Sequence, residues 1–86
     1  MNVGDIVLVS WLDSRIGPHG WEPKDDLATL EPVECKTAGF LTGLGKQHIV
    51  MAMTDASDQT VHRIAIPRCS IKNVVLLRPA WKFDEA

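Results

Sequence analysis

The stretch TVHRIAIPRCSIKNVVLL, residues 60–77, indicates how this chain folds. Its two ends are rich in Val, Ile and Leu, which is typical of strands, so we expect strands at 60–66 and 72–77. Pro67 ends the first of them, because proline has no N–H to donate to a central ladder. Residues 68–71 then fit a single tight turn, such as a short 3₁₀ piece.

Three more strands are expected before this unit. Residues 3–12 are rich in Val, Ile and Leu without a helical stripe, which predicts a strand that is apolar on both faces. Alternating residues over 33–41 predict a second strand, with a bend or bulge at 38–39. The glycines of 42–45 predict a hairpin turn, and 46–54 returns as the third strand. A polar turn leads from there to the strand at residue 60.

A long loop is expected between the first two strands. Residues 13–32 contain several prolines and glycines, and each proline fixes φ and removes a backbone donor. Within the loop, 23–30 is expected to hold a helical turn, because adjacent aspartates favour a helix N-terminus and two leucines share a face.

The order of these elements predicts the fold class. A mainly β chain with five short strands, a long first loop and a 3₁₀ turn before the last strand is expected to form a small SH3-like barrel. An OB-like barrel is the alternative five-stranded arrangement. We expect one domain over 1–79 and a C-terminal tail over 80–86. Trp81 and Phe83 alternate with a lysine, so the tail is expected to add an edge strand or to cover an apolar patch.

Composition indicates an ordinary globular chain. Of 86 residues, 45% are hydrophobic and 23% are charged, which excludes wholesale disorder. A chain of this length buries only about 60–65% of its unfolded surface, so a homo-oligomer is expected to add buried area. No apolar run approaches the roughly eighteen residues of a membrane span, and no basic segment of a signal peptide precedes the first strand. We therefore expect a cytoplasmic protein whose Cys35 and Cys69 are reduced, small core residues.

The formal charge of −2 conceals an uneven distribution. Residues 1–31 carry two basic and six acidic side chains, a charge of −4, whereas 32–79 carry six basic and three acidic ones, a charge of +3. Between residues 60 and 78 there is no Asp or Glu at all. The basic part could receive ligand phosphates, or it could pair with the acidic part of an identical subunit.

No pattern of catalytic or metal-ligating residues stands out. Asp13, Ser14 and His19 have the residue types of a nucleophilic triad, but Asp and Ser at a strand end more often bond backbone amides. The histidines and cysteines lack the close spacing of zinc ligands, and no glycine-rich phosphate loop is present. We expect a non-enzymatic protein without a metal or cofactor.

The long loop holds the candidate ligand-binding residues. Arg15, His19 and Trp21 place cations and a large aromatic ring on one segment, and Arg68 adds a cation from the basic part. Such a set can stack a base and neutralise a phosphate. The alternative for Trp21 is structural, as a lid folded back over the open end of the barrel.

Several short segments together resemble a family of small uncharacterised bacteriophage proteins with an SH3-like barrel. The resemblance covers the chain to about residue 77, and the segments that carry it are Val3 to Asp5, Val9 to Ser14, Trp21, Cys35 to Gly39 and Ile66 to Ile71. It implies a counter-defence protein in the host cytoplasm, which either blocks a protein or sequesters a nucleotide signal.

We therefore expect a homo-oligomer that binds a nucleotide signal between its subunits. A protein–protein inhibitor of a host defence enzyme, acting through the acidic loop, is the first alternative. A weak binder of single-stranded nucleic acid is the second alternative, and it predicts steep salt dependence.

Overall fold

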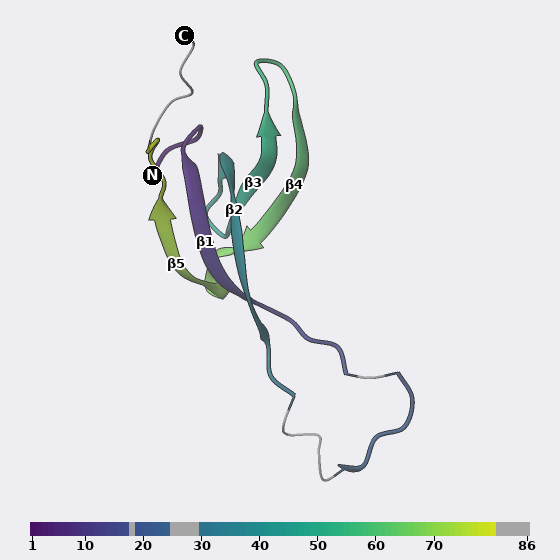
Figure 1. Ribbon diagram of the computed structural model, residues 1–86. Coiled ribbons are helices and arrows are strands. Elements are labelled where there is room, and N and C mark those ends of the chain that lie inside the picture. The colour runs from purple at the N-terminus through teal and green to yellow at the C-terminus, as the bar shows by residue number, and fades with distance from the viewer. Residues whose placement is uncertain (18, 25–29, 81–86) are drawn as a thin grey trace.

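The computed structural model describes residues 1–17, 19–24 and 30–80. The chain forms one antiparallel sheet of five strands in the order β4-β3-β2-β1-β5 (Figure 1). The elements are β1 (Ile6–Asp13), β2 (Val33–Leu44), β3 (His48–Asp55), β4 (Thr60–Pro67), the 3₁₀ helix η2 (Arg68–Ser70) and β5 (Ile71–Leu76). The mainly β fold with five strands and a 3₁₀ turn before the last strand is confirmed.

Two details of β2 differ from the expectation. The turn predicted at 42–45 is wrong, because β2 continues to Leu44 and the Gly45 N–H closes the turn by donating to the His48 carbonyl at 2.9 Å. The bend predicted at 38–39 is also displaced. The pairing of β2 with β1 passes regularly through this point, and the irregularity lies between Leu41 and Gly43, in the pairing with β3.

Strand β2 divides its pairing between two neighbours. Residues 33–40 pair with β1, whereas the pairing with β3 begins only at Phe40 and ends at Leu44. The β3–β4 hairpin therefore diverges from the first half of β2, as Figure 1 shows. In the part of the chain that is described, no ladder joins β4 to β5, so the two outer strands of the sheet are not hydrogen-bonded to one another.

The core lies on one face of the sheet and draws on four strands. Its buried side chains are Val7, Val9, Trp11, Leu41, Ile49, Met51 and Ile66. Alternation along β1 places its three members on the same face, where Trp11 is 9% exposed. The Trp11 Nε1–H donates to the Thr37 Oγ1 at 2.9 Å, which satisfies the one polar group of the indole.

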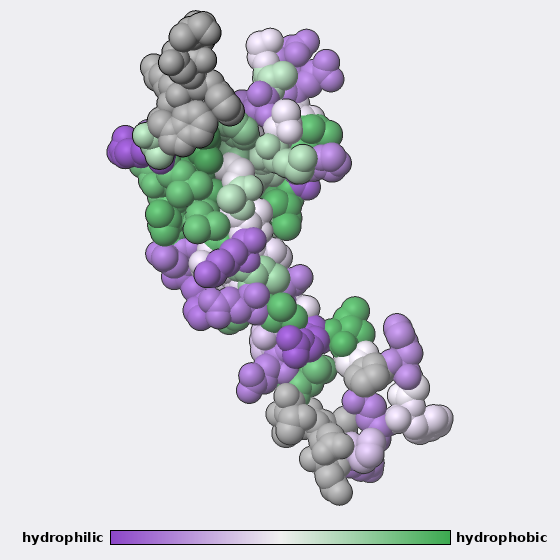
Figure 2. Space-filling model, in the orientation of Figure 1, coloured by the Kyte–Doolittle hydropathy of each residue, from purple (hydrophilic) through white to green (hydrophobic). Residues whose placement is uncertain are grey.

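The two cysteines are both free, as expected, but only one is associated with the core. Cys35 is half-buried and packs against the core cluster, whereas Cys69 is exposed on η2, so the expectation of a core residue is wrong there. The reason is that η2 contributes no buried residue. Hydrophobic side chains also gather on the surface of the molecule (Figure 2). Ile6 on β1 and Val75 on β5 are each more than 40% exposed.

The described residues between β1 and β2, namely 14–17, 19–24 and 30–32, are here called the arm and extend away from the sheet (Figure 1). The lid interpretation of Trp21 is wrong, because its side chain is fully exposed at 104% and packs on nothing. The arm is flanked by Asp13 and Val33, which pair with one another in the sheet, so its two ends are held close together. The helical turn predicted at 23–30 falls mostly outside the described residues, as does the tail from 81 onward.

His62 adopts a left-handed backbone conformation within β4, with φ of 57°. This conformation costs most residues about 1–2 kcal/mol but costs glycine nothing of that kind. His62→Gly is therefore expected to be more stable than His62→Ala by about 0.5–1 kcal/mol, the reverse of an ordinary strand position. Urea unfolding of the two variants measures the difference, and a more stable alanine variant would contradict the assignment.

Candidate ligand-binding site

Three of the four predicted site residues lie together on the arm. Arg15, His19 and Trp21 are all exposed, and Ile16 beside them is 86% exposed. An arm that presents two large apolar side chains to water loses the stabilisation that burying them would provide. Fully exposed aromatic surface on a projecting segment is therefore more typical of a binding surface than of a structural element.

The fourth residue, Arg68, belongs to the body of the sheet. It begins η2, and its Nε–H donates to the Gly45 carbonyl at 2.7 Å, while its backbone N–H donates to the Gln47 carbonyl at 2.8 Å. These two bonds attach η2 to the β2–β3 turn. Among the described residues, no hydrogen bond or ion pair joins Arg68 to the arm, so the four predicted residues do not form one contact network within a single chain.

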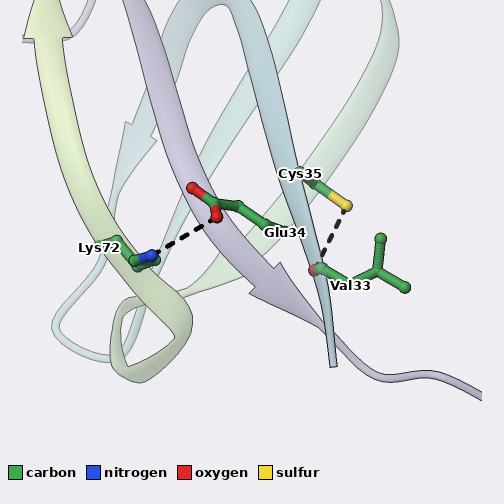
Figure 3. A network of polar contacts seen from close by, with 4 residues as sticks. All are labelled: Val33, Glu34, Cys35 and Lys72. Atoms are coloured by element: carbon green, nitrogen blue, oxygen red, sulfur yellow. Dashed lines mark hydrogen bonds and ion pairs between the residues drawn. The ribbon is translucent and has the colours of Figure 1, made fainter. Parts of the chain in front are cut away.

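One of the basic residues after position 60, Lys72, forms an ion pair with an acidic residue. Lys72 Nζ lies 3.6 Å from Glu34 Oε2, across β1, and both side chains are about half exposed (Figure 3). An exposed ion pair of this kind contributes little to stability. Arg63 and Arg78 are also exposed, so the basic character expected of this region is accessible to an anion.

Asp13 and Ser14 behave as a strand end rather than as catalytic groups. The Ser14 N–H donates to Asp13 Oδ1 at 2.8 Å, as expected for an aspartate that bonds a nearby amide. Within the described ranges, no three His, Cys, Asp or Glu side chains gather as a metal site would require. Nor does any helix there have the length and apolarity to cross a membrane.

A cavity of about 280 Å³ was not anticipated from the sequence. It lies where the β3–β4 hairpin diverges from β2, and its lining consists of Thr37, Ala38, Met51, Ala52, Met53, His62 and Ile64. The lining is mostly apolar, with a histidine and a threonine as its polar members. Alternation within β3 signals that Met51 and Met53 share a face, but no local pattern reveals the divergence of two strands that creates the space.

The arm and the cavity are thus the two features with the geometry to bind something. The arm supplies exposed cations and an exposed indole, and the cavity supplies a mostly apolar recess between β2 and the β3–β4 hairpin. No family model, no curated protein and no solved structure matches the chain.

Proposed function

We propose that this protein is a non-enzymatic binding protein that works as a homo-oligomer and holds a nucleotide between its subunits. The observation that carries the proposal is the complete exposure of Trp21 on an arm that also presents Arg15 and His19. An indole stacks on a base whatever the base is, and this contact is worth about 1–3 kcal/mol. Arginine supplies a planar fork of donors for a phosphate, to which a histidine adds a further donor.

Arg68 fits this arrangement as a residue contributed by a second subunit. Its Nε is engaged by the Gly45 carbonyl, and the terminal guanidinium nitrogens have no hydrogen bond to a described residue. They are therefore available to a phosphate. In this proposal the ligand lies between the body of one subunit, which carries Arg68, and the arm of another.

The resemblance to small bacteriophage proteins supports a biological setting for the proposal. In that setting the protein acts in the host cytoplasm and removes a nucleotide signal on which host defence depends. Sequestration needs affinity and no catalysis. The basic residues that follow position 60, without any Asp or Glu to 78, favour an anionic ligand.

Calorimetric titration with a panel of linear and cyclic nucleotides tests the proposal. Trp21→Ala is expected to weaken binding of the preferred nucleotide by about tenfold to a hundredfold, because the stacked base loses its partner. Ile16→Ala is the matched control, since it removes an exposed apolar side chain from the same arm without removing an aromatic ring. Absence of heat with every nucleotide would contradict the proposal.

A protein–protein inhibitor is the second candidate, and the projection of an acidic arm favours it. The arm carries more acidic than basic residues, and its described members Glu22 and Glu31 are exposed. Capture of a host enzyme that is lost on charge reversal of Glu22 and Glu31, without any nucleotide binding, would favour this candidate over the first. Single-stranded nucleic acid would instead show binding that weakens steeply with salt.

A further inference from the structure

The first half of β2 has a neighbour on one side only. Residues 33–38 pair with β1 before the ladder to β3 begins at Phe40, so among the described residues no strand is hydrogen-bonded to the opposite edge of this segment. The exposed side chains along it are Glu34, Lys36 and Ala38. An open edge of this kind is a template for another strand.

The hydrogen bonds on the β1 side of β2 show which of its residues direct their N–H and C=O groups to the open edge. The Leu41 N–H donates to the Asp5 carbonyl at 2.8 Å, and the Leu41 carbonyl accepts the Gly4 N–H at 2.8 Å, so Leu41 faces β1. The register with β1 is regular from Phe40 to Val33. In an antiparallel ladder the direction alternates, so odd-numbered residues face β1 and even-numbered ones present their N–H and C=O groups to the open edge.

We propose that a second copy of this chain pairs with this edge, antiparallel and about a two-fold axis, in the register centred on Cys35. This register sets Glu34 opposite the partner's Lys36 and Lys36 opposite the partner's Glu34. Both residues of each pair are even-numbered, so both direct their backbone groups to the partner strand. Two opposite-charge pairs result, and such cross-strand pairs stabilise a sheet.

Other registers are less favourable. Centring the pairing on Glu34 or on Lys36 sets that residue against the same residue of the partner, and like charges directly opposite are destabilising. Centring it between two residues pairs an open-edge residue with one that faces β1, which breaks the ladder. Centring it on Thr37 sets Glu34 against the partner's Phe40, whose open-edge groups already pair with β3.

The outer edges of the sheet do not offer the same complementarity. Strand β4 reads TVHRIAIP and β5 reads IKNVVL, and neither contains an acidic residue. A two-fold pairing of either strand therefore gains no opposite charges. Strand β4 also ends in Pro67, which has no N–H to donate.

Glu34 must leave Lys72 to face the partner's Lys36, and this costs little. The Glu34–Lys72 pair has a separation of 3.6 Å with both side chains about half exposed. Exposed ion pairs at such distances are weak. In the proposed dimer, Glu34 of each chain exchanges its exposed ion pair with Lys72 for an ion pair with the partner's Lys36 across the new ladder.

The register also determines on which side of the ladder the partner's arm leaves it. It sets the partner's Pro32 level with Ala38, which lines the cavity, so the partner's arm leaves the pairing on the cavity side. The described residues that precede the partner's Pro32 then leave the ladder next to the body of the first subunit. This inference rests on the homo-oligomer of the proposed function, but it is independent of the ligand.

Sedimentation of the full chain without nucleotide is the test. The wild type is expected to be a dimer, and Lys36→Glu to weaken it by about tenfold or more, because both charge pairs become Glu–Glu pairs. The double variant Glu34→Lys with Lys36→Glu restores the pairs in reverse and is expected to restore the dimer. Lys72→Ala is the control, since it removes the partner of Glu34 outside the interface. A monomeric wild type at the highest soluble concentration, or a charge swap that restores nothing, would overturn the proposal.

Cysteine cross-linking gives an independent readout of the register. Residues at a non-hydrogen-bonded antiparallel pair have Cα atoms about 4.5 Å apart, within the range that a disulfide spans. Mild copper-catalysed oxidation is therefore expected to link the two copies through Cys35. Cys69→Ser should leave the link intact and Cys35→Ser should abolish it, whereas a dimer linked only through Cys69 would exclude this register. Nucleotide binding by a monomer would overturn the interface alone, and a dimer that binds no nucleotide would overturn the ligand alone.

Discussion

Replacement of Trp11 by alanine is expected to lower the free energy of unfolding by about 3–5 kcal/mol, because the largest side chain of the core is removed. The indole is 9% exposed and belongs to the core cluster with Val7 and Val9. Its removal leaves a cavity that the surrounding strands can fill only partly. A domain of this size has roughly 5–15 kcal/mol of total stability, so the variant is expected to be partly unfolded at 37 °C.

Trp21→Ala is the matched control for this experiment. The residue type and the substitution are the same, but Trp21 is fully exposed, so its removal is expected to change stability by less than about 0.5 kcal/mol. Urea unfolding followed by circular dichroism measures both variants. Equal losses in the two would contradict the placement of Trp21 on the arm and of Trp11 in the core.

Trp11→Phe separates packing from hydrogen bonding at the same position. The variant keeps an aromatic ring but removes the N–H that donates to Thr37 Oγ1 at 2.9 Å. Thr37 is then left without this partner, and the loss includes the smaller volume of the ring, so we expect a cost of about 1–3 kcal/mol. A Phe variant as unstable as the Ala variant would show that the hydrogen bond, and not the burial, dominates.

Replacement of Gly39 by alanine has the second largest expected effect. A Cβ at this position would lie 2.6 Å from the Ala52 carbonyl oxygen, and both groups belong to the backbone of paired strands. Neither can rotate away, so β2 and β3 must separate at the point where their ladder begins. We expect a loss of about 1–3 kcal/mol in the free energy of unfolding.

Gly43→Ala is the control within the same strand. Its Cβ would lie 3.4 Å from the Val50 Cβ, an ordinary van der Waals distance, so the substitution is expected to be nearly neutral. Thermal unfolding of the two variants compares them directly. A Gly39→Ala protein as stable as Gly43→Ala would contradict the close approach of the two strands at Gly39.

The proposed dimer and the proposed ligand site would together account for two unusual features of this structure. A fully exposed tryptophan and a half-open β2 are both costly in an isolated chain, one through hydrated apolar surface and the other through an unprotected strand edge. In the proposed dimer, the pairing of two β2 strands would cover this edge. The proposed ligand would cover Trp21, with Arg68 contributed by the other subunit.

Local patterns in the sequence were sufficient to predict all five strands to within a few residues. Most of the strands are rich in Val, Ile or Leu and are bounded by Gly, Pro or polar turns, and these signals act over short distances. Pro67 marked the end of β4 and the start of the 3₁₀ turn. The sequence likewise placed Arg15, His19 and Trp21 on one long loop between the first two strands.

The sequence by itself therefore determined the strands and the tight turn, because each depends on neighbours along the chain. Only the tertiary structure decided that β2 divides its pairing, that Gly39 touches the Ala52 carbonyl, and that Trp21 stands clear of the sheet. Each of these depends on contacts, or their absence, between residues far apart in sequence. Periodicity within one strand indicates which face is buried, but it does not indicate where a neighbouring strand turns away and leaves an open edge.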